Sequence, residues 1–237
     1  MQTMCSTRTI RTTGPAQLAG EFFNKLSPEM VNELASLQHV SAYPANHILF
    51  TERDEAQGLY LVLEGEVKLS INSSDGRRLI LRIARKGEVI GLAAALTGKP
   101  YEMTAETIYS SRVAFISRRD FILFLAHHPD VYQLVTAELS RHYAMACEQL
   151  RTVGLASSAP AKLARLLLDW SSNGQLTETG TRFRFSLTHE EIGECIGTSR
   201  ETVTRTLGVF KTRRLVNFSG STLTIPNLNA LQSYAGC

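Results

Sequence analysis

Four polar side chains near the C-terminal end of the sequence have the chemistry to read DNA. At their spacing, Glu201, Thr204 and Arg205 fall on one side of an α-helix, and Arg200 stands at the edge of that side. A guanidinium can donate two parallel hydrogen bonds to O6 and N7 of guanine, and a carboxylate can accept one from the N4 amine of cytosine. These four residues are therefore the predicted base-reading residues of a major-groove helix. The alternative is that Glu201 and Arg205 only form an i, i+4 ion pair on a solvated surface.

Two helix starts stand close together around these residues. Thr188 with Glu191, and Thr198 with Glu201, each match an S/T-x-x-E capping box, in which side chains satisfy the free amides of a helix N-terminus. The first helix is predicted over 189–196, because a glycine and the second box interrupt it. Two short helices joined by a tight turn indicate a helix-turn-helix.

The second helix combines a buried stripe with basic surroundings. Val203, Leu207 and Phe210 recur at i, i+4 and i+7, which predicts a side packed in a core. Residues 198–218 hold five basic side chains and one acidic side chain, whereas the whole chain has a formal net charge of +3. Such a local excess of positive charge suits the phosphate backbone of duplex DNA. The predicted phosphate contacts are Thr188, Thr198, Ser199, Thr202, Lys211, Arg213 and Arg214.

The elements that must position this segment change in character along the chain. A short helix is predicted over 18–36. From Val40 to Ser117, short runs alternate between apolar and polar residues with glycines between them, which predicts an antiparallel β-roll or jelly roll. A β-hairpin wing is predicted over 217–225. The fold class is α+β, with four parts: a disordered N-terminal tail at 1–17, a β-roll sensor domain at 18–128, a dimerisation helix at 129–154, and a winged helix-turn-helix domain at 155–237.

The long helix between the two domains has an apolar seam. Its members recur at steps of three or four residues and are Val135, Leu139, Tyr143, Ala146, Leu150 and Val153. A near-heptad seam of this kind favours a coiled-coil homodimer, and helix-turn-helix proteins usually bind two half-sites as two-fold dimers. The alternative is that the seam packs against its own β-roll.

Other classes of function find little support in the sequence. The six histidines form no i, i+2 pair in the β region, and the G-x-S-x-G, phosphate-loop and H-E-x-x-H motifs do not occur. No catalytic residue and no metal site are therefore predicted. The four cysteines form no C-x-x-C pair, which argues against a zinc ribbon.

The longest apolar run, 89–96, is too short to span a bilayer, and no signal peptide is recognised, so we expect a cytoplasmic protein without a membrane partner. A further alternative is a protein-interaction module whose helix-turn-helix no longer binds DNA. The polar side of the second helix, with Arg200, Glu201, Thr204 and Arg205, argues against this alternative.

A glycine-punctuated β domain, a long helix and a winged helix-turn-helix together resemble the CRP/FNR family of bacterial transcription regulators. The resemblance covers about residues 20–230; its most specific segment is IGECIGTSRETVTRTLGVF at 192–210, with EGEVKL at 64–69 as a second match. It implies DNA recognition through Arg200, Glu201 and Arg205 or, in the FNR branch, through Glu201, a Ser or Thr (here Thr204) and Arg205. It also implies a homodimer on a palindromic promoter site with a TGA-containing half-site, and contact with RNA polymerase.

The resemblance also implies an effector site between the β-roll and the long helix. Its lining would come from Gly91, Leu92, Ala93, Tyr101, Met103, Thr104, His142 and Ala146. Members that bind cyclic AMP carry a glutamate after the glycine and an arginine about ten residues further on. Leu92 and Glu102 stand in those regions here, which argues against cyclic AMP. Iron–sulfur members need a cluster of N-terminal cysteines, and Cys5 alone lies there, which argues against an iron–sulfur cluster. Haem with His142 as its ligand, an unidentified small molecule, and the absence of any effector all stay open.

Overall fold

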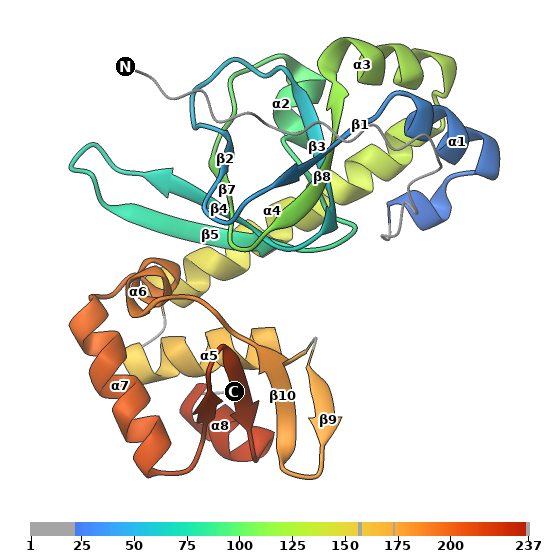
Figure 1. Ribbon diagram of the computed structural model, residues 1–237. Coiled ribbons are helices and arrows are strands. Elements are labelled where there is room, and N and C mark those ends of the chain that lie inside the picture. Colours follow the sequence, from blue (N-terminus) through green and yellow to red (C-terminus); the bar gives the residue numbers. More distant parts are fainter. Residues whose placement is uncertain (1–21, 156–157, 173, 236–237) are drawn as a thin grey trace. The chain divides into compact units, whose positions relative to one another are not determined.

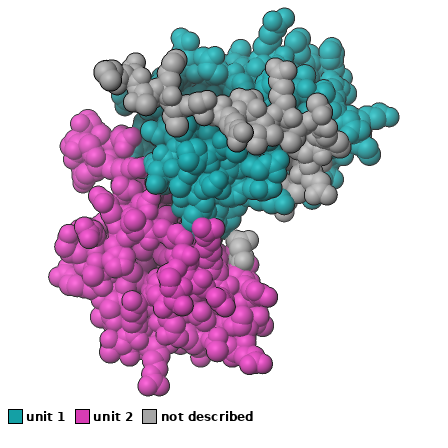
Figure 2. All heavy atoms as spheres, viewed as in Figure 1, with its two compact units in different colours: residues 1–71, 81–145 teal, residues 72–80, 146–237 magenta. Residues whose placement is uncertain are grey.

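The computed structural model describes residues 22–155, 158–172 and 174–235, and Figure 1 shows their fold. Two compact units make up the chain: residues 1–71 with 81–145, and residues 72–80 with 146–237 (Figure 2). The predicted tail at 1–17 lies outside the described residues. None of the helices in the described part has the length and apolar character needed to cross a membrane.

The described part of the first unit begins with two short helices, whereas a single helix was predicted at 18–36. The 3-10 helix η1 spans Phe23–Lys25, and α1 spans Pro28–Ser36. Ser27 caps α1, because its side chain accepts a hydrogen bond from the amide of Met30 at 3.3 Å. Pro28 fits the first turn of α1, where no intrahelical partner exists for an amide hydrogen, but it cannot continue a helix that began earlier. Residues 18–21 lie outside the described part.

Eight strands form the β-roll that the sequence predicted. Four of them lie in one sheet with the order β1-β8-β3-β6, and four lie in a second sheet with the order β2-β7-β4-β5. Strands β3 and β8, and likewise β4 and β7, pair in the antiparallel direction. The strands are β1 (His39–Tyr43), β2 (Ile48–Phe50), β3 (Gly58–Glu64), β4 (Val67–Asn72), β5 (Arg78–Ala84), β6 (Val89–Ile90), β7 (Thr104–Thr107) and β8 (Ser111–Ser117).

Strand β3 contributes to two cores through its two faces. Leu59, Leu61 and Leu63 belong to the core that the helices share, whereas Val62 belongs to the core that contains residues of both sheets. Successive side chains of a strand point to opposite faces, so the residues at odd positions meet the helices and Val62 meets the second sheet. Leu61 lies opposite Ala114 of β8 in the ladder. The strand is therefore buried on both faces.

Three further helices follow in the first unit, and the last of them continues along the chain into the residues of the second unit. They are α2 (Leu92–Thr97), α3 (Arg118–His127) and α4 (Val131–Leu155). Phe121 and Phe124 of α3, with Val131 of α4, join the helix-lined core. Helix α2 stands in a region that the sequence assigned to strands; its run LAAALT consists mainly of strong helix formers, which explains the difference.

The second unit is a winged helix-turn-helix, as predicted. Its sheet has the order β11-β12-β10-β9, and β11 with β12 forms the predicted hairpin wing. Leu163, Leu167 and Trp170 fill its core, where the Trp170 ring meets Phe185 edge-on with centroids 4.8 Å apart. The elements are α5 (Ala159–Ser171), β9 (Gln175–Thr177), β10 (Gly180–Arg184), α6 (His189–Ile196), α7 (Arg200–Thr212), β11 (Asn217–Ser219), β12 (Thr222–Ile225) and α8 (Leu228–Ala235).

Candidate DNA-binding surface and ligand cavity

Helix α6 begins with the predicted capping box. The Thr188 hydroxyl accepts a hydrogen bond from the amide of Glu191 at 3.1 Å, and the Glu191 carboxylate accepts one from the amide of Thr188 at 2.8 Å. The helix ends at Ile196, and Gly197, whose φ of 63° lies in the left-handed region, caps its C-terminal end. The predicted bounds of 189–196 are confirmed.

The second predicted capping box is wrong by one residue. The cap of α7 is Ser199, whose hydroxyl accepts a hydrogen bond from the amide of Thr202 at 3.3 Å. Thr198 still belongs to the turn, because its amide donates to the carbonyl of Gly193 at 3.0 Å and thereby closes α6. Glu201 is consequently not part of a cap and remains on the outer side of α7.

Gly193 allows the turn to approach α6 closely. A Cβ atom at this position would lie 2.6 Å from the carbonyl oxygen of Thr198. Contacts this short between a carbon and a backbone oxygen do not occur without movement of the backbone. The glycine is therefore required by the packing of the turn against the helix.

Helix α7 has the two sides that the sequence predicted. Val203, Leu207 and Phe210 are at most 3% exposed. On the opposite side, four polar side chains are exposed to solvent: Arg200, Glu201, Thr204 and Arg205. The sequence pattern of apolar positions therefore places the four candidate base-reading residues together at the surface.

Arg205 does not form the ordinary surface ion pair that was the alternative interpretation. Its Nη2 donates to the hydroxyl of Thr202 at 3.2 Å, and within the described part of the chain no ion pair joins it to Glu201. The Arg205 residue is exposed to solvent. The pKa of Glu201 is held below its usual range by its own backbone amide, then by the Ser199 hydroxyl and by the nearby charges of Arg200 and Arg205. Glu201 is therefore an ionised acceptor at neutral pH.

His189 is a residue of this surface that the sequence did not suggest. Its Nδ1 lies 2.8 Å from the hydroxyl of Thr204, which itself donates to the carbonyl of Arg200 at 2.9 Å. A hydroxyl has one hydrogen, so Thr204 accepts the hydrogen bond from Nδ1. The two residues are 15 positions apart on different helices, and no local pattern in the sequence links them.

The predicted phosphate contacts fall into two groups. Thr188, Ser199 and Thr202 already serve the caps of the two helices, and Thr198 lies in the turn between them, as described above. The basic residues lie near the end of α7: Lys211 stands over the Phe218 ring at 4.9 Å, and Arg213 donates to the hydroxyl of Tyr234. Lys211, Arg213 and Arg214 are all exposed. They supply positive charge next to the exposed polar side of α7.

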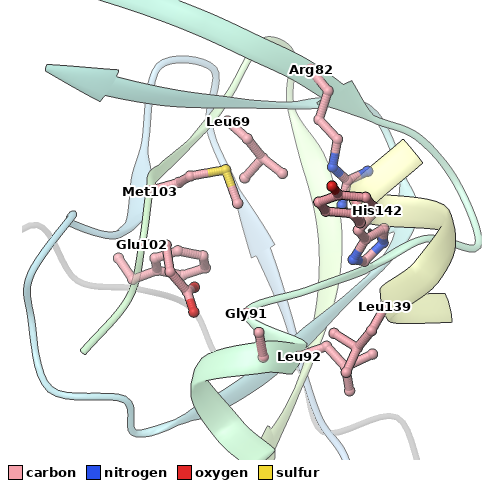
Figure 3. A pocket seen from close by; sticks show the side chains of 11 residues that line it. Leu69, Arg82, Gly91, Leu92, Glu102, Met103, Leu139 and His142 are labelled. Carbon is pink, nitrogen blue, oxygen red and sulfur yellow. Dashed lines mark hydrogen bonds between the residues drawn. The ribbon is translucent and has the colours of Figure 1, made fainter. Parts of the chain in front are cut away.

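The first unit contains a cavity of about 240 Å³ (Figure 3). Five of the eight predicted pocket residues line it, namely Gly91, Leu92, Ala93, Met103 and His142, and Ala146 is not among its lining residues. The side chains of the two remaining candidates, Tyr101 and Thr104, form hydrogen bonds to backbone groups outside the cavity lining. Tyr101 donates to the carbonyl of Gly58 at 2.7 Å, and Thr104 accepts from the amide of Glu52 at 3.0 Å. The cavity is also lined by Phe50, Leu69, Arg82, Glu102, Leu139 and Tyr143, which the sequence had not assigned to it.

A network of charged groups forms one end of this cavity. Arg82 donates to the carboxylate of Glu88, and its Nη2 lies 3.2 Å from Nε2 of His142. The same Nε2 lies 3.0 Å from a carboxylate oxygen of Glu138, which also accepts from Arg141 at 2.5 Å. The Arg82 side chain is 10% exposed and that of Glu138 is 8% exposed. Burial holds the pKa of Arg82 below its usual range, although a guanidinium remains charged.

The predicted dimer seam is divided by the structure. Val135 is 1% exposed and belongs to the helix-lined core, and Leu139 packs against that core and lines the cavity. These two positions pack within their own unit. Tyr143 and Leu150, seven residues apart, are 74% and 64% exposed.

Among the described residues, no group of three or more His, Cys, Asp or Glu side chains is arranged to hold a metal ion.

Comparison with known proteins agrees with this architecture. Residues 40–128 match the cyclic nucleotide-binding domain family, and residues 161–234 match the Crp-like helix-turn-helix domain family. A CRP-like cAMP-activated global transcriptional regulator of Mycobacterium tuberculosis is 25% identical over 210 residues, which are 88% of this chain and 93% of that protein. The cAMP-activated global transcriptional regulator CRP of Escherichia coli is 24% identical over 188 residues, or 79% of this chain and 89% of that protein.

A solved structure shares the fold. The structure of FixK2 from Bradyrhizobium japonicum superposes with a TM-score of 0.75 at 23% identity, and the match covers 83% of this chain and 96% of that one. The two domain matches occur in the order in which the β-roll and the helix-turn-helix follow one another here. This chain therefore belongs to the CRP/FNR family of transcription regulators.

Proposed function

We propose that this chain acts as a homodimer that binds a palindromic promoter site with a TGA-containing half-site. The observation that carries the proposal is the exposed polar side of α7, which stands opposite an anchored apolar side. Arg205 would donate to O6 and N7 of guanine, and Glu201 would accept from the N4 amine of the paired or neighbouring cytosine. Arg200 and Thr204 would contact adjacent bases. The TGA core itself follows from the resemblance to the family.

The dimer would form through the exposed part of α4. Tyr143 and Leu150 are large, exposed and seven residues apart, which places them on one side of the helix. A two-fold dimer would present its two α7 helices to half-sites about 34 Å apart, one turn of duplex DNA. Contact with RNA polymerase at the promoter is part of the same proposal and rests on the family alone.

The effector of the first unit is, in this proposal, neither cyclic AMP nor haem. A cyclic nucleotide needs polar partners for its ribose as well as for its phosphate, but Leu92 and Ala93, which follow Gly91 at the cavity, offer none, and the exposed carboxylate of Glu102 lines it as well. The cavity volume of about 240 Å³ is also below that of pockets for drug-sized ligands. Haem needs a free imidazole nitrogen. Nε2 of His142 already lies between Glu138 and Arg82 at 3.0 Å and 3.2 Å. These contacts support a different ligand class.

Selection from random duplexes with the purified full chain tests the proposed function. The expected product is an inverted repeat with TGA in each half, bound by two chains as measured by sedimentation. A selected site without two-fold symmetry, or binding by a single chain, would contradict the proposal. If the protein binds all duplexes of the random pool with equal affinity, α7 does not read bases.

A further inference from the structure

The charged end of the cavity in the first unit defines the class of ligand that the cavity suits. We propose that it takes a small organic monocarboxylate with an apolar body, whose carboxylate binds the guanidinium of Arg82 beside His142. The inference rests on the proposed function in one respect only: it names the effector of that regulator. The proposed ligand differs from the cyclic AMP of the cAMP-activated relatives in its anionic group, a carboxylate instead of a cyclic phosphate, and in its smaller size.

The body of the cavity is apolar. Leu92 is 2% exposed, and Met103 and Leu139 lie on other walls of the same space (Figure 3). The volume of about 240 Å³ is below the roughly 300–1,000 Å³ of pockets that hold drug-sized molecules. An apolar group the size of one aromatic ring or a short alkyl chain would fill such a space and remove it from water.

The guanidinium of Arg82 has donors to spare for a carboxylate. A guanidinium has five N–H groups. Glu88 accepts from Nη1, the carbonyl of Val89 accepts from Nη2 at 3.4 Å, and His142 stands at 3.2 Å from Nη2. The planar fork can therefore bind a second carboxylate without releasing Glu88 completely. Among the described lining residues, Arg82 is the side chain with a permanent positive charge.

The charges around the cavity limit the ligand to one negative group at one place. The charges of Arg82 and Arg141 balance those of Glu88 and Glu138 at this end, so no excess of positive charge attracts further anions. A single carboxylate would be held there by the unused guanidinium donors of Arg82. Glu102 lies across the cavity from Arg82 (Figure 3), and its negative charge disfavours a second anionic group at the other end of the ligand. A monocarboxylate therefore fits this pattern better than a dicarboxylate does. A nucleoside cyclic phosphate carries one negative charge as well, but it is large for a cavity of about 240 Å³.

A ligand at this end would act directly on α4. Glu138, Arg141 and His142 all belong to that helix, whereas Arg82 lies on β5 and Glu88 directly precedes β6. A carboxylate that draws Arg82 towards the cavity changes its contacts with His142 and Glu88 together. The occupied cavity would thus alter how α4 is held by the β-roll, which is a route from the ligand to the rest of the chain.

Calorimetry on the full chain, without DNA, tests the proposed ligand class. The probes are benzoate, phenylacetate and hexanoate, each compared with its uncharged amide of nearly the same shape. We expect at least one acid to bind at least about tenfold more tightly than its amide, because hydrogen bonds to charged groups are the stronger ones. Equal binding of acids and amides, or no binding by any of the three acids, would overturn the proposal. So would binding of cyclic AMP in preference to the acids.

Variants assign the preference to Arg82. Arg82→Gln combined with Glu88→Gln removes the charged pair without leaving an unpaired buried charge, and should abolish the preference for acid over amide. Glu102→Gln is the matched control and should leave acid binding equal or tighter. If the double variant does not fold, Ala93→Leu, which fills the cavity and keeps Arg82, should abolish binding of every probe. An acid preference that survives the double variant, or binding that survives Ala93→Leu, would place the ligand elsewhere.

The two proposals fail separately in these experiments. The calorimetric titrations contain no DNA, so a missing inverted repeat in the selection does not affect them. Conversely, a protein that selects an inverted repeat but binds none of the acids keeps the proposed DNA function and loses this inference.

Discussion

The hydroxyl of Thr204 is fixed by two neighbours before any DNA is present. It donates to the carbonyl of Arg200 and accepts from His189, at 2.9 Å and 2.8 Å. We expect His189→Ala to weaken binding of the selected site by about 0.5–1.5 kcal/mol, the usual net value of one hydrogen bond, and to relax the base preference next to Thr204. Fluorescence anisotropy with the selected site and single-base variants measures both effects.

A double-mutant cycle distinguishes positioning from direct contact. If His189 acts through Thr204, the variant with both His189→Ala and Thr204→Ala should bind as Thr204→Ala does alone. Additive losses would mean that His189 contacts the DNA independently, and the assignment as a positioning residue would be wrong.

Glu138 gives the first unit a measurable dependence on pH. Burial would raise the pKa of its carboxyl, but hydrogen bonds from His142 and Arg141 lower it, from 4.5 to about 2. Because the pKa is lower in the folded state, the ionised carboxylate stabilises the fold above pH 4.5, and this stabilisation is lost as the pH falls from 4.5 towards 2. Glu138→Gln should therefore cost about 1.5–3 kcal/mol at pH 7, and progressively less at low pH.

Urea unfolding of both proteins at pH 7, 4 and 2.5 checks this expectation. Glu148→Gln on the same helix is the control: its partner Arg151 and Glu148 itself are 67% and 63% exposed, so the loss should be below about 1 kcal/mol. A destabilisation by Glu138→Gln that is independent of pH would show that the charge of Glu138 does not matter.

Single site residues could be predicted from the sequence where apolar residues recur at a regular spacing in the same helix. The base-reading candidates share one side of α7 because apolar positions every three or four residues fix the opposite side. Arg82 and His142, by contrast, are 60 positions apart and meet only through the fold. The contact between His189 and Thr204, which are 15 positions apart, escaped notice for the same reason.

Among the elements, the turn between α6 and α7 depends most on one residue. Gly193→Ala would place a Cβ atom 2.6 Å from the carbonyl oxygen of Thr198. Backbone at this distance must move, and we expect a loss of about 1–3 kcal/mol, as for other overpacked sites. Thermal unfolding of the full chain should show a lower midpoint, and DNA binding should weaken because α7 shifts.

The same substitution in the next helix provides a control. A Cβ atom at Gly208 would meet nothing within 4 Å, and this residue lies inside α7. Gly208→Ala should therefore stabilise the helix by up to about 1 kcal/mol. If Gly193→Ala were as well tolerated as Gly208→Ala, the close approach at the turn would not hold in solution.

The observed boundaries of the elements agree with those predicted from the sequence, except where a backbone hydrogen bond assigns a potential capping residue to the preceding helix. Thr198 has the residue type of a helix cap, but its amide closes α6, so Ser199 caps α7 instead. In the same way, the apolar run at Leu92–Thr97 was assigned to the β region and forms α2. The periodicity of apolar residues alone does not separate a short buried strand from a short buried helix.

For the whole molecule, the proposed dimer makes a prediction about α4. Leu150→Asp places a charge in the proposed interface and should shift the protein to monomer. Leu176→Asp on β9 is the control, because Leu176 is 81% exposed and lies outside α4. Analytical ultracentrifugation should show a monomer for the first variant and an unchanged mass for the second. A dimer in both would place the interface away from Leu150.

The order of the domains was predictable from the sequence, whereas the partner of the long helix was not. A β-roll, a long helix and a winged helix-turn-helix each have their own periodicity. The apolar seam of α4 did not reveal which of its residues its own unit covers: Val135 is buried there and Leu150 is exposed. A one-dimensional pattern marks an apolar side but does not identify what packs on it.

The most direct test of base reading by α7 is the affinity of three proteins for two DNAs. The proteins are the wild type, Arg205→Ala and Lys211→Ala; the DNAs are the selected site and the same site with its TGA guanine replaced. Arg205→Ala should lose about 1–3 kcal/mol on the selected site and almost nothing on the altered one. Lys211→Ala should weaken both equally and lower the salt slope by about one. If Arg205→Ala still discriminates between the two DNAs as the wild type does, this guanine is not read by Arg205 and the account of α7 is contradicted.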